Sequence, residues 1–105
     1  QALYYRLNGD DNPLHSDPAI AARAGFPRPI LHGLCTLGCV GHALLRTLGG
    51  YDTSRFRDLA MRFSSPVYPG ETIRVEIWRD GSFRALVPAR GIVAVNNGLA
   101  GFTKD

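Results

Sequence analysis

The chain has 105 residues, of which 45% are hydrophobic and 20% are charged, and its formal net charge is +3. This length suits one domain, the composition argues against a disordered tail, and no apolar run approaches the roughly 20 residues of a membrane span. The arginines are dispersed along the chain, a pattern that disfavours a nucleic-acid partner and better suits a small anionic ligand such as one carrying phosphates.

The first third of the chain is predicted to form short helical turns joined by a turn-rich loop. Residues 2–7 can form one or two helical turns, and residues 8–16 are rich in Gly, Asp, Asn and Pro. Asp17 followed by Pro18 is typical of a helix N-cap, which predicts a short helix over residues 18–24 that ends at Gly25. Residues 26–30 hold two prolines and are expected to be extended or turning.

The longest periodic segment, residues 33–48, predicts a largely buried helix that ends at Gly49-Gly50. At about 100° per residue, its apolar side chains and glycines share one wide arc. His32, Thr36 and His42 fall on the other side and form one polar edge. The members of the apolar arc are Gly33, Leu34, Leu37, Val40, Gly41, Leu44, Leu45 and Leu48.

The second half of the chain is predicted to be a β meander. Short apolar runs at 59–63, 72–78, 83–87 and 92–95 are separated by turn signals, and 99–102 can add a fifth strand. The last of these turn signals is Asn96-Asn97-Gly98. One long helix followed by a meander indicates an α+β fold in which an antiparallel sheet packs on a central helix.

The chemistry-bearing residues concentrate in the loop of residues 9–15. Asp10 and His15 are five residues apart, and Asn12-Pro13 forces a turn between them. A carboxylate beside an imidazole can activate water, whereas the alternative is a plain loop in which Asp10 and Asn12 make side-chain turns. A calcium loop is excluded, because Ala21 stands where such a loop requires Glu.

Three ordered motifs carry a resemblance that covers most of the chain. The run YRLNGDDNPLH from Tyr5, the segment FPRPILHG from Phe26 and the run RFSSPVYPGET from Arg62 resemble the signatures of the (R)-specific enoyl-CoA hydratases, the hydratase 2 or MaoC-like dehydratase family. The resemblance implies the hot dog fold, a curved antiparallel sheet wrapped around one long helix. It also implies hydration of trans-2-enoyl-CoA to (R)-3-hydroxyacyl-CoA, or the reverse dehydration, with no cofactor because CoA is part of the substrate.

The resemblance also implies roles for four residues. Asp10 and His15 would be the catalytic pair that activates water, and Asn12 would help to orient the pair. The Gly33 N–H would bind the thioester oxygen. Gly33 opens the long helix, where amides are unpaired and the dipole end is positive, so a donor there can stabilise developing negative charge.

Substrate contacts are expected at two further places. Arg28 and Arg62 are candidates for a CoA phosphate, with a solvated surface role as the alternative. The acyl chain is expected to run from Gly33 along the helix face of Leu37, Gly41 and Leu44. A glycine inside a helix costs about 1 kcal/mol relative to alanine, and either close strand packing or room for substrate could offset that cost.

The series His32, Cys35, Cys39 and His42 resembles a set of zinc ligands, but we expect no metal. His32 and His42 lie ten residues apart, about 15 Å along a straight helix, which is too far for one tetrahedral ion. We instead expect buried structural cysteines and a buried His32 that supports the site.

The organisation expected from the resemblance is one hot dog domain over residues 1–105. This domain would lack its first strand or form the C-terminal half of a double hot dog, so a second hot dog is the expected partner, as a homodimer or as a fused N-terminal half. The sequence shows no secretory signal. We expect an intracellular, cytoplasmic protein, or a peroxisomal one in a eukaryote.

Two other functions stay open at this point. A hot dog thioesterase would use a carboxylate on the long helix, and residues 33–48 contain no Asp or Glu. A non-catalytic acyl-CoA-binding hot dog would not need the Asp10–His15 pair, which is intact here.

Overall fold

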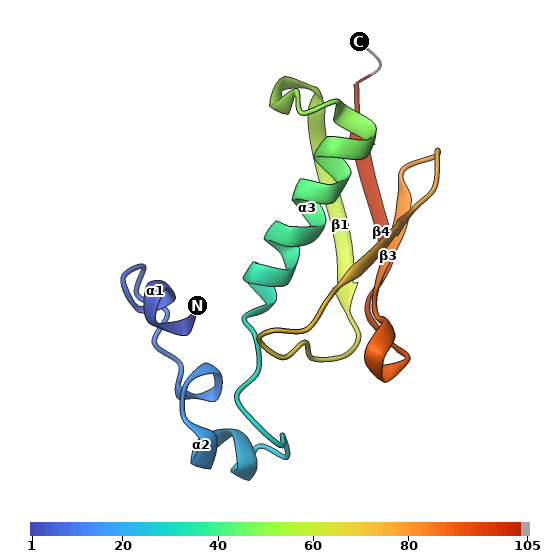
Figure 1. Ribbon diagram of the computed structural model, residues 1–105. Coiled ribbons are helices and arrows are strands. Elements are labelled where there is room, and N and C mark those ends of the chain that lie inside the picture. Colours follow the sequence, from blue (N-terminus) through green and yellow to red (C-terminus); the bar gives the residue numbers. More distant parts are fainter. Residues whose placement is uncertain (104–105) are drawn as a thin grey trace.

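A computed structural model describes residues 1–103 as one long helix packed on a four-stranded antiparallel sheet (Figure 1). The α+β prediction is therefore confirmed. Three short elements lie beyond the N-terminal end of the long helix, away from the sheet. The elements are α1 (Ala2–Arg6), η1 (Pro13–His15), α2 (Pro18–Arg23), α3 (Gly33–Gly49), η2 (Thr53–Arg55), β1 (Phe56–Phe63), β2 (Arg74–Ile77), β3 (Ser82–Val87), η3 (Pro88–Arg90) and β4 (Ile92–Phe102).

Side-chain caps shape the N-terminal segment, as its sequence predicts. The Asp17 carboxylate accepts a hydrogen bond from the Ala19 N–H at 2.9 Å and starts α2. The Asn12 side chain accepts from the Leu14 N–H at 3.0 Å and starts η1. Ala21 is the only buried residue among residues 1–31, so hydrophobic burial contributes little to holding this segment.

Helix α3 has the predicted extent, but its buried face is turned toward Thr36. It begins after His32 and ends at Gly50, which adopts the left-handed conformation at φ 59°. Its buried stripe contains Thr36, Val40 and Leu44, which are spaced at four residues. The prediction is wrong for Thr36, expected on the polar edge but 3% exposed, and for Leu34, expected inside but 66% exposed.

The sheet has the strand order β1-β4-β3-β2, so the predicted meander is wrong for β1. Strand β4 pairs with β3 on one side and with β1 on the other. The predicted turn at Asn96-Asn97-Gly98 is also wrong, because these residues continue β4 through irregular registers with both neighbours. Asn97 has a positive φ of 52°, as in a β-bulge, and a side chain at Gly98 would overlap the Phe83 ring.

The main core lies between α3 and the sheet. Val40 and Leu44 of the helix are fully buried with Ala85 and Val95 of the strands, and Phe83 is 3% exposed. A smaller cluster of Val67, Val87 and Ala94 continues toward the N-terminal end of α3. Among the helices formed by residues 1–103, none combines the length and apolar character needed to cross a bilayer.

Gly41 faces open space, so close packing of a strand does not explain why a glycine stands at this position of the helix. A Cβ built at Gly41 meets no described atom within 4 Å. We therefore expect Gly41→Ala to raise the free energy of unfolding by about 0.5–1 kcal/mol, because alanine lowers the entropy lost on helix formation. Urea denaturation of the purified protein measures this change.

Gly49 offers the matched control on the same helix. A Cβ at Gly49 would lie 2.8 Å from the Phe102 ring, so Gly49→Ala should lower the free energy of unfolding. A Gly41→Ala variant that is less stable than the wild type would contradict the open space at position 41.

Candidate active site

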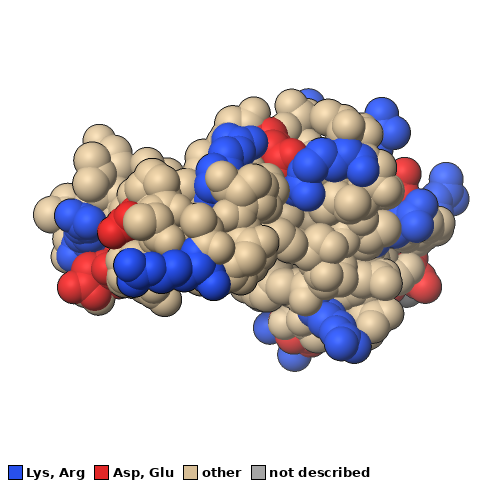
Figure 2. Space-filling model, turned by 90° about the horizontal axis from the view of Figure 1, so that it is seen from below, with Lys and Arg blue, Asp and Glu red and all other residues tan. Residues whose placement is uncertain are grey.

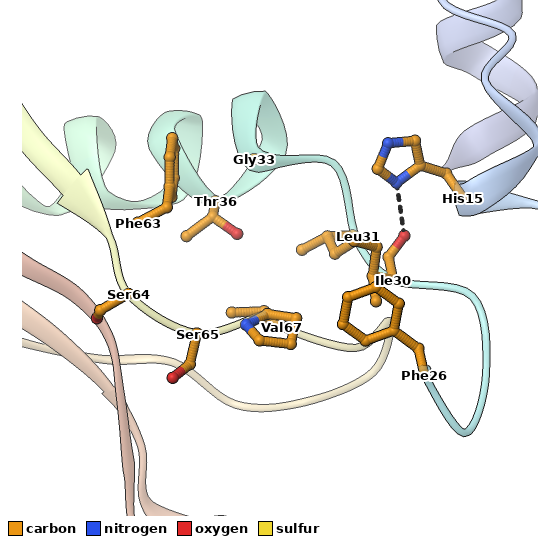
Figure 3. Close-up of a pocket in the computed structure, with 11 residues that line it drawn as sticks. His15, Phe26, Ile30, Leu31, Gly33, Thr36, Phe63, Ser64, Ser65 and Val67 are labelled. Carbon is orange, nitrogen blue, oxygen red and sulfur yellow. Dashed lines mark hydrogen bonds between the residues drawn. The ribbon is translucent and has the colours of Figure 1, made fainter. Parts of the chain in front are cut away.

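A cavity of about 380 Å³ opens at the N-terminal end of α3. Its walls come from the start of the helix, from the segment that leads into it and from the loop after β1 (Figure 3). Most of the lining side chains are apolar, as is usual for a small-molecule site. The lining residues are His15, Phe26, Ile30, Leu31, Gly33, Thr36, Phe63, Ser64, Ser65, Pro66 and Val67.

The His15 imidazole is held with one defined nitrogen available for chemistry. Its Nδ1 lies 2.9 Å from the Ile30 carbonyl oxygen (Figure 3). A carbonyl can only accept, so Nδ1 carries the proton and Nε2 of the neutral ring keeps its lone pair. This contact selects the tautomer in which Nε2 is the nitrogen that can act as a general base, at the edge of the cavity.

His32 is the buried centre of the polar cluster beside the cavity. It is 3% exposed, its ring stacks on His15 with centroids 3.7 Å apart, and Tyr5 packs against it at 4.2 Å. The Gln1 side-chain amide contacts Nδ1, and Nε2 faces the Asp10 carboxylate at 3.5 Å. Burial, and then the neighbouring His15, lower the pKa of His32 below its usual value, so the ring is neutral near pH 7.

Asp10 and His15 each contact the His32 ring rather than each other. The Asp10 side chain is 48% exposed and approaches the His32 imidazole, while His15 stacks on the same ring. Among the described residues, no hydrogen bond joins Asp10 directly to His15. Asn12 lies between them in the chain and caps the helical turn that carries His15, which suits the orienting role predicted for it.

Gly33 places a backbone amide at the cavity wall. It is the first residue of α3, and its N–H has no acceptor within residues 1–103. The N-terminal end of a helix carries partial positive charge, so this N–H can bind an oxyanion. A Cβ here would lie 3.3 Å from the Phe63 ring, which leaves little room for a side chain.

Thr36 is a cavity residue that the sequence did not single out. It lies one turn after Gly33, and its hydroxyl is directed into the cavity in Figure 3. The signal in the sequence was its spacing of four residues from Val40 and eight from Leu44. Thr36 is polar, and hydrophobic periodicity counts only apolar residues, so this spacing alone does not assign Thr36 to the buried face.

The cavity wall after β1 is fixed by a clamp of charged side chains. The Arg90 guanidinium makes two hydrogen bonds to Glu71, at 2.6 and 2.8 Å, and a third to the Pro66 carbonyl at 2.8 Å. Glu71 also accepts from the Tyr68 N–H at 2.7 Å, and its pKa is lowered chiefly by Arg90. The Leu31 N–H donates to the Val67 carbonyl at 2.7 Å and joins this wall to the entry of α3.

The predicted CoA-binding arginines lie outside the cavity lining. The Arg28 guanidinium lies over the Tyr68 ring at 4.8 Å and donates to the Pro69 carbonyl at 3.3 Å. Arg62 is exposed on β1, next to the cavity residue Phe63. Figure 2 shows Lys and Arg dispersed over the face in view rather than gathered in one stripe.

The residues predicted to contact the acyl chain are also outside the cavity lining. Leu44 is fully buried in the core, and Leu37 and Gly41 are partly buried further along α3. Only Gly33 and Thr36 of α3 line the cavity. A path for the acyl chain past Leu37, Gly41 and Leu44 stays a prediction.

The cysteines differ from their predicted burial. Cys35 is half-buried, and Cys39 is exposed, so the prediction of buried structural cysteines is wrong for Cys39. His32 is buried beside the site, as expected. Within residues 1–103, no group of three or more His, Cys, Asp or Glu side chains is placed to hold a metal ion.

The comparisons with known proteins agree with this architecture. The family model described as MaoC like domain matches residues 1–98. The chain is 56% identical over 87 residues to 3-hydroxyacyl-thioester dehydratase Y of Mycobacterium tuberculosis, covering 82% of this chain and 30% of that protein. It is 53% identical over 81 residues to peroxisomal enoyl-CoA hydratase 2 of Arabidopsis thaliana, covering 77% and 26%.

A solved structure confirms the hot dog fold. A MaoC-like dehydratase from Phytophthora capsici superposes with a TM-score of 0.91 at 48% identity, over 99% of this chain and 37% of that one. The predicted hot dog, one long helix against an antiparallel sheet, is thus confirmed. The chain spans between 26% and 37% of the length of each of these three proteins.

Proposed function

The chain belongs to the MaoC-like domain family, and from that membership we propose that it hydrates 2-enoyl thioesters of CoA to 3-hydroxyacyl thioesters, or catalyses the reverse dehydration. The observation that carries the proposal is the cluster at the N-terminal end of α3. The cavity there is lined by His15 and by Gly33, whose N–H has no acceptor within residues 1–103, and the Asp10 carboxylate lies beside them against His32. These are an acid–base pair and an oxyanion donor, the two requirements for adding water to a conjugated thioester.

In the proposed reaction, the Asp10–His15 pair transfers the protons and the Gly33 amide binds the thioester oxygen. The Asp10–His15 pair takes a proton from water as its oxygen forms a bond to C3, and a proton is returned to C2. Electron density moves from the double bond to the thioester oxygen during this addition. The Gly33 N–H binds that oxygen and stabilises its negative charge.

Hydration of crotonyl-CoA is the direct test. The wild type should consume the conjugated double bond, seen as loss of its ultraviolet absorbance, and the product should be 3-hydroxybutyryl-CoA. The (R) configuration rests on the family resemblance, and chiral analysis of the product decides it. An (S) product would contradict that assignment without affecting the proposed hydration.

The same assay separates the two alternatives. A thioesterase would release free CoA, which a thiol reagent detects, but α3 carries no Asp or Glu for that chemistry. A non-catalytic binding domain would leave the substrate unchanged. The packed and hydrogen-bonded His15 and the buried His32 favour hydration over either alternative.

Arg28 is proposed to contact a phosphate of CoA. Tyr68, whose ring packs against Arg28, directly follows the cavity residue Val67. Arg28→Ala should raise the KM for crotonyl-CoA about threefold to fivefold at low salt with little change in kcat, since an exposed ion pair contributes up to about 1 kcal/mol. Arg62→Ala tests the second predicted contact in the same way.

Arg23→Ala is the matched control, because Arg23 is an exposed arginine at the end of α2. If KM is unchanged in both Arg28→Ala and Arg62→Ala, the phosphate contact lies elsewhere. A rise in KM that persists at high salt would also contradict an exposed ion pair.

The partner and the cellular location are proposals of the same kind. A second hot dog, as a homodimer or as a fused N-terminal half, would cover sheet edges that β1 and β2 leave unpaired within residues 1–103. An intracellular location, cytoplasmic or peroxisomal, would bring the protein together with acyl-CoA substrates.

A further inference from the structure

His32 connects the two ends of the proposed site. Its ring lies between Tyr5 of α1 and His15 of η1, and its Nε2 faces Asp10. Its backbone is directly bonded to Gly33, the residue that carries the proposed oxyanion donor. One buried side chain therefore contacts both members of the acid–base pair from the residue next to the amide.

The protonation of His32 suits a contact with a carboxylate. The Gln1 amide nitrogen donates to Nδ1, so neutral His32 carries its proton on Nε2. That N–H is buried, has no hydrogen-bond partner within residues 1–103 and lies 3.5 Å from the Asp10 oxygen. Moving the carboxylate by about 0.6 Å would form an ordinary hydrogen bond, and contacts of this kind shorten when substrate binds.

We propose that His32 is a positioning residue that keeps the Asp10 carboxylate and the His15 imidazole at fixed positions relative to the Gly33 amide. The inference rests on the proposed function. His32 makes two separable contributions: its Nε2–H orients Asp10, and its ring supports His15 by stacking. Neither contribution requires His32 to touch the substrate, and the cavity lining does not include it.

Three substitutions separate these contributions. His32→Phe keeps an aromatic ring between Tyr5 and His15 but removes the N–H that faces Asp10. His32→Gln keeps a donor near the position of Nε2 but removes the ring. His32→Leu removes both. Each variant is compared with the wild type for crotonyl-CoA hydration, for thermal stability and for the NMR signal of the His15 ring N–H.

The expected kinetic result is a loss in kcat rather than in KM. His32→Phe should lower kcat about 10- to 100-fold, the range for one hydrogen bond to a charged group, with KM within about twofold of wild type. His32→Gln should retain more activity than His32→Leu, because only glutamine supplies a donor to Asp10. A merely structural role would not rank Gln above Leu.

The NMR measurement tests the stacking contribution without reference to activity. The His15 Nδ1–H is held by the Ile30 carbonyl, so it should give a slowly exchanging ring resonance in the wild type. That resonance should persist in His32→Phe and disappear through exchange in His32→Leu. If it persists unchanged in His32→Leu, His32 does not position His15.

His42→Phe is the matched control, since His42 is an exposed histidine on the same helix. It should leave kcat unchanged. A His32→Phe variant with kcat within twofold of wild type, or a His42→Phe loss equal to that of His32→Phe, overturns the positioning of Asp10. Should His32→Phe fail to fold, the ranking of His32→Gln against His32→Leu decides the same point.

The outcome is distinguishable from failure of the proposed function. A wild type that hydrates no enoyl-CoA contradicts the function, and the His15 resonance then decides the positioning contact by itself. An active wild type with an equally active His32→Phe contradicts only the positioning of Asp10.

Discussion

Asp10→Asn and His15→Gln should each reduce the hydration rate at least about 100-fold while the protein stays folded, because positioned acid–base groups contribute about 10²- to 10⁴-fold. Both residues lie in the N-terminal segment, where neither is buried, so their replacement removes few core contacts. Asparagine cannot accept a proton at neutral pH, and glutamine cannot replace the Nε2 lone pair of His15. The measurements are kcat and kcat/KM with crotonyl-CoA, together with a thermal unfolding curve.

Neighbouring residues provide the controls for these two changes. Asp11→Asn alters an exposed carboxylate next to Asp10, and His42→Gln alters an exposed histidine on α3. Both controls should keep wild-type turnover. Retention of more than about a tenth of wild-type turnover in Asp10→Asn or His15→Gln would contradict the role assigned to that residue.

Gly33→Pro should lower kcat about 100- to 1,000-fold, the loss measured when one oxyanion donor is removed. Proline has no N–H, yet the local backbone accepts it. Gly33 is the first residue of α3, where proline is favoured, and His32 has the extended conformation (φ −60°, ψ 136°) that a following proline requires.

Gly33→Ala separates the amide from the size of the side chain. The alanine Cβ would meet the Phe63 ring at 3.3 Å, as the proline Cβ would, but alanine keeps the N–H. We expect Gly33→Ala to lose far less activity than Gly33→Pro. Equal losses in the two variants would show that crowding against Phe63, rather than the missing donor, causes the effect.

The helices could be predicted because local side-chain chemistry sets their ends. Asp17 followed by Pro18 starts α2 through a hydrogen bond within three residues, and Gly50 ends α3 by adopting a positive φ. Both signals act between near neighbours in the chain, so the sequence displays them directly.

The sequence predicts most of strand β4 as two separate strands, but its continuity through residues 96–98 could not be predicted, because turns and bulges use the same residue types. Asn97 has a positive φ in this strand, as it would in a hairpin turn. Whether the chain reverses or continues depends on the pairing of β4 with both β1 and β3, and those partners are distant in sequence. Local pattern alone therefore favours the turn.

The sequence predicts that four residues of the site lie together but not which contacts join them, and their catalytic roles stay predictions. Asp10, Asn12, His15 and Gly33 lie around one end of α3, as the family motifs imply. The contact between Asp10 and His32 depends on the N-terminal loop folding back onto the start of α3, across about 20 residues of chain. Helical periodicity assigns His32 and Thr36 to a polar edge, because it takes no account of segments distant in sequence that pack against the helix, such as the loop that carries His15.

The N-terminal segment, which carries Asp10 and His15, should open at a lower free energy than the rest of the domain. Residues 1–31 bury a single alanine, while α3 and the sheet share the main core. Elements with few buried contacts open at a lower free energy than the global unfolding reaction. The amides of this segment should therefore exchange with solvent deuterium faster than those of β3 and β4, and heating should abolish turnover at a temperature at which the sheet is still intact.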